Sequence, residues 1–410
     1  MNYLRLLLGG CVWLLTLSTA HAQGKLTGVV QDSVTHEPLA FASVFLANTT
    51  LGATTTEKGE FEFKRVPAGT YSVVGSYVGY RLAKQTITMT AAPQQVMLLL
   101  PSTGNQLSEV VVQPEPNKPE DYKKFAELFL GGTTFSEQCR ISNPDQVRVF
   151  YDAETEELTA RAKQFVQVDN EALGYRLKYY GLHFDYDAGD GSVSYFGEPV
   201  FEDLPPRDEA QRQLWAANRA TAYRGSFMHF LRSVYTNRLK AENFLTQQVR
   251  VTPNPRFEQA ENKRRALMAL RPAGTFTPAE KDSLERWDAM APAFATLNQT
   301  PRSIDSIRRV SADGKRVFLR FTGELQVAHF GEAPDPRYGQ PMSPLGYPRT
   351  PYPTKQQVSR LKLQNREAEI QPNGTLMSPL DVYNGEYWGF EKVGEFMPVN
   401  YVPSDTKPTP

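Results

Sequence analysis

Short runs of alternating hydrophobic and polar residues, separated by turns, fill the segment from Lys25 to about Leu100. Alternation with a period of two is typical of strands that bury one face, and a spacing of roughly 8–12 residues favours an all-β sandwich. Glycines lie at or beside the turns, where a positive φ is easy only for glycine. The predicted strands are Lys25–Gln31, Ala42–Leu46, Gly59–Lys64, Thr70–Tyr77 and Gln85–Met89.

Helical and strand-like periods are mixed after residue 119. Glu120 to Leu130 is predicted to be a helix that carries Phe125, Leu128 and Phe129 on one face and ends at Gly131. Further helices are predicted at Arg207–Tyr223, Ser226–Asn243 and Pro278–Trp287. Strands are predicted at Val147–Tyr151, Leu158–Val168, Tyr175–Tyr186, Ser192–Phe201, Ser306–Val310, Arg316–His329 and Val358–Leu363, with Tyr175–Tyr186 and Ser192–Phe201 forming a hairpin. The fold class is therefore mainly β with helical insertions, a β-sandwich followed by a larger α+β domain.

The first 22 residues have the pattern of a secretory signal peptide. Arg5 supplies the positive start, Leu6 to Leu17 the apolar stretch, and Ala20-His21-Ala22 the small-residue cleavage site. A lipoprotein signal at Cys11 is disfavoured, because the apolar run continues after the cysteine instead of ending before it. No later apolar run approaches the roughly 18 residues of a membrane span. We expect an exported protein of the periplasm or the outer-membrane surface, without a transmembrane helix.

The pattern divides the chain into five parts. Residues 1–22 are the signal peptide, 23–101 the sandwich, 102–119 a strand and proline-rich linker, 120–402 the larger domain and 403–410 a disordered tail. The linker contains Leu107 to Val112, a segment very similar to the box that TonB grips in outer-membrane receptors. Such a receptor needs a barrel of about 22 strands, for which the remaining chain is too short. A TonB-linked component is therefore a disfavoured alternative.

Charge and cysteine content narrow the classes of function. The chain has 45 basic and 45 acidic residues, so it lacks the positive charge that dominates nucleic-acid binding, and we expect no nucleic-acid partner. Once the signal peptide is removed, Cys139 is the only cysteine, which excludes an internal disulfide and paired-cysteine metal sites. A single thiol is more often a small buried hydrophobe than a nucleophile.

Five segments of the sandwich occur in the order of a known module and together resemble the carboxypeptidase-regulatory-like domain. They are Gly28–Asp32, Glu37–Val44, Gly52–Phe61, Val66–Tyr71 and Val78–Tyr80. The resemblance implies a seven-stranded, transthyretin-like sandwich that is not catalytic despite its name. It also implies an accessory or spacer role in exported proteins and a fold related to some carbohydrate-binding domains. Its aromatic residues mostly alternate with polar ones, so core positions are expected for Phe41, Phe45, Phe61, Phe63 and Tyr71.

The larger domain is similar to a family of exported Bacteroidetes-type proteins. The resemblance rests on several motifs, among them Arg219 to Arg232 (RATAYRGSFMHFLR) and Tyr387 to Val393 (YWGFEKV). These proteins typically carry the same N-terminal module. The resemblance implies architecture and export and no particular chemistry.

Two groups of residues are candidates for ligand binding. Arg219 and Tyr223 share a helical stripe, and His229 and Arg232 are three residues apart, so together they are suited to an anion or a carboxylate. The alternative is an internal hydrogen-bond network. Tyr387 and Trp388 belong to an aromatic-rich C-terminal segment that is suited to stacking on a sugar.

Catalytic and metal motifs fail when they are tested residue by residue. His329 and Glu332 match the first pair of a zinc carboxypeptidase, but no third histidine follows them. Asp185, Asp187 and Asp190 suggest a calcium loop, yet the spacing departs from the EF-hand pattern at three positions. We therefore predict no catalytic residue, no metal and no cofactor.

The sequence favours an exported, non-catalytic cell-envelope protein with a binding or structural role. The sandwich would be the accessory module, and the larger domain would hold an envelope protein or a glycan. One alternative is an envelope hydrolase whose site lies around Arg224, His229 and Asp185.

Overall fold

The computed structural model describes residues 23–103, 117–189, 191–271, 275–338 and 355–403. The predicted signal peptide with Cys11 and the TonB-box-like segment Leu107–Val112 lie outside these residues. The chain forms two compact units, Met1–Phe45 with Gly52–Asn105 and Leu46–Leu51 with Gln106–Pro410. Within the described ranges, no helix is both long and apolar enough to cross a membrane.

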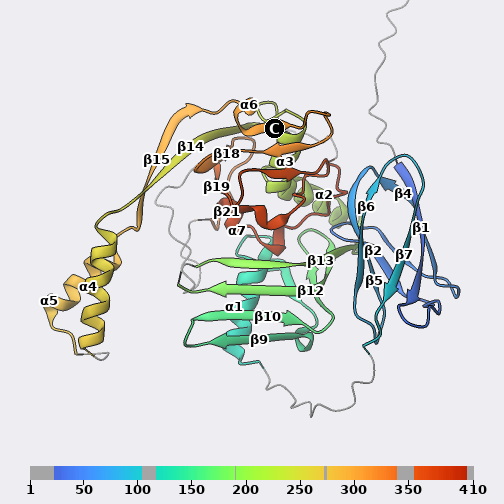
Figure 1. The fold of residues 1–410 in the computed structure, drawn as a ribbon, viewed down its shortest axis with the longest axis horizontal. Helices are drawn as coiled ribbons and strands as arrows, with labels where there is room; N and C mark the ends of the chain where they lie inside the picture. Colours follow the sequence, from blue (N-terminus) through green and yellow to red (C-terminus); the bar gives the residue numbers. More distant parts are fainter. Residues whose placement is uncertain (1–22, 104–116, 190, 272–274, 339–354, 404–410) are drawn as a thin grey trace, which may run out of the picture. The chain divides into compact units, whose positions relative to one another are not determined.

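The first unit contains seven strands in two sheets, as the resemblance implied (Figure 1). One sheet has the order β4-β1-β7, with β1 Gln23–Asp32, β4 Glu60–Pro67 and β7 Gln94–Leu100. The other has the order β3-β2-β5-β6, with β2 Ser43–Leu46, β3 Gly52–Thr54, β5 Gly69–Ser76 and β6 Ala83–Met89. The alternating pattern did not reveal β3, which is short, or β7.

Residues that alternate along β1, β4 and β7 fill the core of this unit. Leu26 and Val30 are fully buried, and Phe61 from β4 lies so close to β1 that only a glycine fits at position 28. A Cβ atom there would lie 2.2 Å from the carbonyl oxygen of Val96. The prediction for Phe41 is wrong, because its side chain is 66% exposed on a turn residue with a φ of 60°.

A six-stranded antiparallel sheet forms the first half of the second unit. Its long strand β12 (Tyr175–Asp187) pairs with β11 (Phe165–Asn170) at its start, with β10 (Glu157–Ala162) at its end and with β13 (Val193–Asp203) along the other edge. The outer strands are β8 (Cys139–Ile141) and β9 (Val147–Asp152). The predicted single strand Leu158–Val168 is thus two strands, because each half pairs with a different part of β12.

Helix α1 (Pro119–Leu130) covers one face of this sheet. Its predicted apolar stripe is confirmed, since Phe125, Leu128 and Phe129 are all buried. The ring of Phe125 meets Phe184 of β12 edge-on, with centroids 5.1 Å apart, and burying such aromatic residues stabilises the packing. Residues of the opposite sheet face point to solvent, which becomes important for the site described below.

A five-stranded sheet forms the second half, in the order β15-β14-β18-β19-β21. The strands are β14 Phe244–Pro253, β15 Ala293–Pro301, β18 Glu324–His329, β19 Gln357–Leu363 and β21 Val382–Glu386. A small sheet of β16 Arg308–Val310, β17 Val317–Leu319 and β20 Ala368–Ile370 lies in the same unit. Phe230, Leu319 and Leu361 are fully buried in the shared core.

The helices of this half are α2 Glu209–Tyr223, α3 Phe227–Tyr235, α6 Ile304–Ile307 and α7 Tyr387–Phe390. Short 3₁₀ turns occur at Ser136–Gln138, Pro144–Gln146, Pro379–Asp381 and Val393–Glu395. The predicted helix Ser226–Asn243 ends early, at Tyr235, because Asn237 and Asn243 have positive φ angles that no right-handed helix permits. Two predicted strands also differ: Ser306–Val310 begins inside α6, and Arg316–His329 is interrupted between β17 and β18.

Strands β14 and β15 continue as a two-stranded ribbon that ends in two helices, α4 (Phe257–Leu270) and α5 (Pro278–Asp288). We call residues 250–297 the arm. In Figure 1 the arm projects to the left, away from the sheets of its own unit. The sequence pattern predicted α5 but neither α4 nor the two strands.

Candidate functional site

Arg219 makes several contacts within the protein. Its guanidinium donates hydrogen bonds to the carbonyl oxygens of Leu173 (2.7 Å) and Gly174 (2.9 Å), and it pairs with Asp203 at 3.0 Å. It also lies 3.7 Å from the ring centroid of Tyr175. These contacts, made through Nε and one Nη atom, fasten α2 to the β11–β12 turn, so Arg219 has a structural role.

Arg232 is equally occupied. Its three guanidinium nitrogens donate to the carbonyl oxygens of Asn373 (2.9 Å), Tyr401 (3.0 Å) and Val399 (2.8 Å). Tyr223 stacks nearby, with its ring centroid 5.2 Å from the guanidinium carbon. Arg232 therefore ties α3 to the C-terminal segment of the chain.

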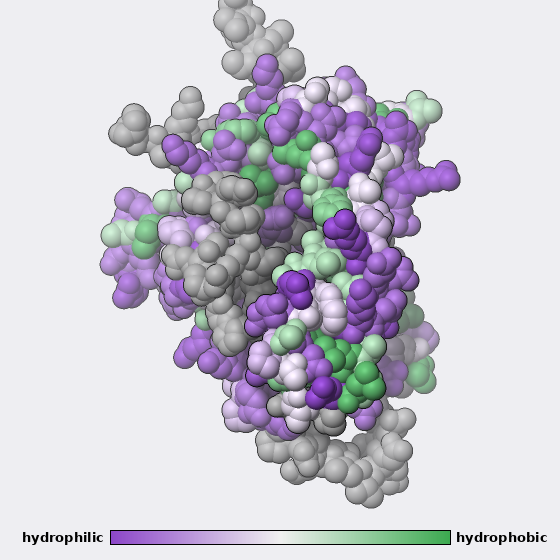
Figure 2. Space-filling model, turned by 90° about the vertical axis from the view of Figure 1, so that its left-hand side faces the viewer, coloured by the Kyte–Doolittle hydropathy of each residue, from purple (hydrophilic) through white to green (hydrophobic). Residues whose placement is uncertain are grey.

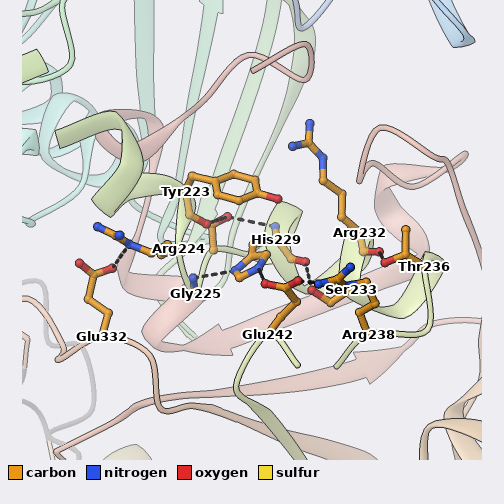
Figure 3. Close-up of polar contacts among 11 residues, drawn as sticks. Tyr223, Arg224, Gly225, His229, Arg232, Ser233, Thr236, Arg238, Glu242 and Glu332 are labelled. Carbon is orange, nitrogen blue, oxygen red and sulfur yellow. Dashed lines mark hydrogen bonds and ion pairs between the residues drawn. The ribbon is translucent and has the colours of Figure 1, made fainter. Parts of the chain in front are cut away.

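His229 belongs to the first turn of α3, and its ring is held at both nitrogens (Figure 3). The backbone N–H of Gly225 donates to its Nδ1 at 3.1 Å, so the proton of the neutral ring is on Nε2, 3.4 Å from a carboxylate oxygen of Glu242. Burial lowers the pKa of His229 and outweighs the opposing effect of Glu242. The ring is thus a neutral structural link.

A second buried histidine lies beside the first. The ring centroids of His229 and His329 are 5.8 Å apart, and burial lowers the pKa of His329 to about 4. Its Nδ1 and the side-chain oxygen of Gln357 are both buried, have no hydrogen-bond partner among the described residues, and lie close to Gly225. A Cβ atom at position 225 would lie 1.9 Å from the Gln357 oxygen. The space between these atoms is therefore filled by the Gly225 backbone.

Glu332 and Arg224 form the outer edge of this cluster, which we call the histidine network. The two side chains approach to 4.0 Å, and burial raises the pKa of Glu332 to about 7 against the influence of Arg224. Burial likewise raises the pKa of Glu395 to about 7. These carboxyl groups are costly to ionise in the folded state.

The three residues of the hydrolase alternative, Asp185, Arg224 and His229, share no contact partner among the described residues. Asp185 lies on β12 and pairs with Arg161 at 2.8 Å, whereas Arg224 and His229 belong to the histidine network. The nearby hydroxyl of Ser226 donates to the Tyr223 carbonyl oxygen as a helix cap. A nucleophile and a base within hydrogen-bond reach are what this chemistry requires, and these residues do not supply them.

The C-terminal aromatic residues are buried. Tyr387 and Trp388 are each only 4% exposed. The indole N–H of Trp388 donates to the Gly225 carbonyl oxygen at 2.8 Å, and the Tyr387 hydroxyl accepts from the Asp335 N–H at 3.0 Å. In this structure neither ring presents a face on which a sugar could stack, so the expectation of a glycan platform at these residues is corrected.

The solvent-facing side of the six-stranded sheet carries a different group of polar and aromatic residues. We call it the open face. Strand pairing aligns its side chains in three rows across β9, β10, β12 and β13. The rows are Asp152–Glu157–Asp187, Phe150–Thr159–Asp185–Ser194 and Arg148–Arg161–His183–Phe196.

Two exposed aromatic features lie on this face. Phe150 is 66% exposed, and Phe196 is 47% exposed although it stacks on His183. The two rings are nearly parallel, at 9°, with centroids 4.7 Å apart. Large apolar rings exposed on a strand surface cost free energy in water and are informative when they flank polar groups.

A half-open cavity of about 300 Å³ lies beside these rings. The residues that line it mostly bear carboxylate or hydroxyl groups, although the accessible lining itself is more apolar than polar; they are Glu157, Thr159, Asp185, Tyr186, Asp187, Ser192 and Ser194. Among the described residues, no group of three or more histidine, cysteine, aspartate or glutamate side chains is arranged to hold a metal ion. Asp190 of the calcium hypothesis lies outside the described residues.

Sequence reasoning identified Asp185 and Asp187 but not the site around them. Phe150 and Phe196 are far apart in sequence, and only the strand register places them on the same face. The alternating pattern of β10 and β12 did indicate which residues face solvent.

Comparison with known proteins identifies the domain family of the first, smaller unit. Residues 26–112 match the CarboxypepD_reg-like domain. The CarboxypepD_reg-like domain covers the seven-stranded sandwich and leaves both the open face and the histidine network outside the match. No curated protein matches the chain.

Similarities to solved structures are remote. A protein from Pseudomonas aeruginosa, provisionally named as carbohydrate binding, is 16% identical over 19% of this chain and 88% of its own, with a TM-score of 0.16. Another of that description, from Bacteroides uniformis, is 10% identical over 44% of this chain and 79% of its own, with a TM-score of 0.16. A Bacteroides fragilis protein of unknown function, provisionally named as membrane-associated, is 12% identical over 85% of this chain and 94% of its own, with a TM-score of 0.17. At such TM-scores these similarities carry no argument about function.

Proposed function

We propose that this chain is a non-catalytic protein of the cell envelope that binds a glycan on the open face of its six-stranded sheet. The observation that carries the proposal is the cavity of about 300 Å³, lined by carboxylate and hydroxyl groups and flanked by the exposed rings of Phe150 and Phe196. That volume is at the lower end of the roughly 300–1,000 Å³ of small-molecule sites. It is suited to one sugar unit of a longer chain.

The chemistry of the face matches that of a sugar. A pyranose has an apolar C–H face that packs on an aromatic ring and a rim of hydroxyl groups that need hydrogen-bond partners. The stacked pair His183 and Phe196 is a rigid surface for the first requirement. Asp187 and Glu157, directly opposite each other on β12 and β10, are acceptors for the second.

Charge restricts the class of glycan. Three carboxylate side chains line the cavity, and only Asp185 among them has a basic partner, Arg161, in the described contacts. A negatively charged sugar would be repelled at this site, whereas a neutral sugar or an amino sugar would not. We therefore expect binding to neutral or amino-sugar polymers and weak binding to uronic-acid polymers.

The experiment is a glycan-array screen of the protein that begins at Gln23, followed by calorimetric titration of the best glycan. Phe196→Ala should weaken binding at least tenfold, because it removes the phenyl ring of the stacked pair. Phe330→Ala is the matched control, since Phe330 is 51% exposed and lies just after β18, away from the open face. Equal binding by wild type and Phe196→Ala, or no binding across neutral and amino-sugar glycans, would remove the proposal.

Export is part of the same proposal. It rests on the apolar stretch and the Ala20-His21-Ala22 site of the first 22 residues, and the CarboxypepD_reg-like domain would act as a spacer or docking module. N-terminal sequencing of the protein from an envelope fraction should give Gln23 as the first residue. An intact N-terminus in a cytosolic fraction would contradict it.

A further inference from the structure

The arm exposes nearly all of its surface. Of the residues described between 250 and 297, only Asn254 and Ala260 are buried. Phe294 is 55% exposed and Leu270 is 80% exposed. Figure 2 turns this side of the molecule to the viewer and shows apolar residues at the surface among polar ones.

Ion pairs rather than an apolar core connect the two helices of the arm. Arg271 of the loop after α4 pairs with Glu280 at 3.0 Å, and Arg264 approaches Asp288 to 3.7 Å. Exposed pairs of this kind contribute roughly 0–1 kcal/mol each. The arm therefore has little burial of its own, and a partner would supply what it lacks.

Strand β15 is the free edge of its sheet, and its hydrogen-bonding groups can be assigned. The N–H of Asn254 donates to the Pro292 carbonyl oxygen, and the N–H of Phe330 donates to the Asn243 carbonyl oxygen. Because backbone groups alternate in antiparallel pairs, the even-numbered residues of β14 face β15 and the odd-numbered ones face β18. On β15, Phe294 and Thr296 then face β14, while the backbone N–H and C=O groups of Ala293, Ala295 and Leu297 point outward.

The edge lacks the usual protection against pairing. Natural edge strands are blocked by charged residues, prolines or bulges. Residues 293–297 (AFATL) contain no charged residue and no proline, and the irregularity of β15 lies after Leu297. This five-residue segment is therefore open to another strand.

We propose that the occupant of this edge is β15 of a second copy of the chain, paired antiparallel about a two-fold axis at Ala295. In this register Ala295 faces its counterpart, Ala293 faces Leu297 and Phe294 faces Thr296 of the other copy. Val251 lies beside Ala295 in the existing sheet, so an apolar row continues across the axis. No two like charges are brought together, because the segment is uncharged.

The two copies would form one continuous sheet across the axis. Five paired residues bury less than the roughly 1,200 Å² typical of stable complexes. The dimer is therefore concentration-dependent, and it should form in the micromolar range rather than persist at nanomolar dilution.

Sedimentation velocity across a hundredfold concentration range tests the proposal on the protein that begins at Gln23. Wild type should shift from monomer to dimer as the concentration rises. Ala295→Pro removes the outward N–H at the axis without removing a β14–β15 hydrogen bond, and it should leave a monomer. Ala295→Lys places two like charges at the axis and should do the same. Ala269→Lys, on the exposed surface of α4, is the matched control and should dimerise as wild type.

The result that would overturn the proposal is a wild-type monomer at every concentration, even if another protein binds the edge. A dimer that persists in both Ala295→Pro and Ala295→Lys would also overturn the proposal. Ala295→Cys gives an independent reading, because oxidation should cross-link two copies through this residue, and no cross-link would contradict pairing at the axis. Circular dichroism checks that each variant is folded.

Discussion

Arg232→Met is the substitution that most clearly separates a structural network from a ligand site. Methionine retains an unbranched apolar stem but lacks the guanidinium group and therefore has no hydrogen-bond donor. The carbonyl oxygens of Asn373, Val399 and Tyr401 would each lose the donor that now lies within 3.0 Å. The stacking of the guanidinium on Tyr223 would be lost as well.

The size of the effect follows from these contacts. A hydrogen bond to a charged group contributes about 1.5–3 kcal/mol net. The three bonds share one guanidinium, and the half-buried site lets water reach some of the released carbonyl groups, so they are not additive. We expect a loss of about 3–5 kcal/mol, a large share of the roughly 5–15 kcal/mol of a typical domain.

Urea unfolding followed by tryptophan fluorescence measures this loss of stability in the second unit, which contains Arg232. After the predicted signal peptide, the tryptophans are Trp215, Trp287 and Trp388, and all three lie in the second unit. The fluorescence signal therefore reports that unit and not the sandwich. The transition of Arg232→Met should move to lower urea with an unchanged slope.

Arg238→Met is the matched control. Arg238 lies one turn after α3, is 63% exposed and pairs only with Glu242 in the described contacts, at 3.2 Å. Its loss should cost less than about 1 kcal/mol. If Arg232→Met cost no more than Arg238→Met while glycan binding was lost, the residue would act on a ligand, and the structural assignment would be refuted.

Three further predictions concern residues of the second unit. Gly225→Ala should destabilise it by about 2–4 kcal/mol in urea unfolding, because φ is +81° and the new Cβ would meet the Gln357 oxygen; a loss below 1 kcal/mol would contradict this. Burial raises the pKa of Glu332 to about 7, so the contribution of this group to the unfolding free energy falls as the pH rises from about 4.5 to 7. Glu332→Gln should therefore gain about 3 kcal/mol over wild type at pH 8 relative to pH 4.5, and an equal difference at both pH values would oppose it. Burial raises the pKa of the Cys139 thiol to about 12, so iodoacetamide at pH 8 should label it at least about a hundredfold more slowly in the folded protein than in urea, as mass spectrometry would show; equal rates would count against burial.

Elements with a strong period were predictable from sequence. The stripe of Phe125, Leu128 and Phe129 indicated α1, and the long alternation of β12 and β13 indicated their hairpin. Both elements bury one face, and burial is what hydrophobic periodicity records. The fold class, a sandwich and an α+β unit, is confirmed for the same reason.

The arm could not be predicted, because its strands bury almost nothing. Every residue of β15 is exposed or half-buried, so the strand has no alternating signal. In α4 only Ala260 is buried, and the charged residues of the helix resemble a loop in sequence. An element that has little core of its own leaves little hydrophobic pattern in the sequence.

The candidate site shows the same limit in another form. The sequence drew attention to Trp388 and Arg232, whose residue types are suited to binding, but burial and backbone carbonyl groups account for both. Phe150 and Phe196 have ordinary strand sequences around them. They lie on one face of the sheet because of the register of β9, β10, β12 and β13, which is a property of the tertiary structure.

Hydrogen–deuterium exchange with and without a saturating neutral or amino-sugar glycan tests the central claim most directly. Binding on the open face should slow exchange in β9, β10 and the hairpin of β12 and β13, which carry Phe150, Thr159, Asp185 and Phe196. Exchange around α3 and the histidine network should not change. Protection confined to α3, to the C-terminal segment or to the sandwich, with the open face unaffected, would contradict the account.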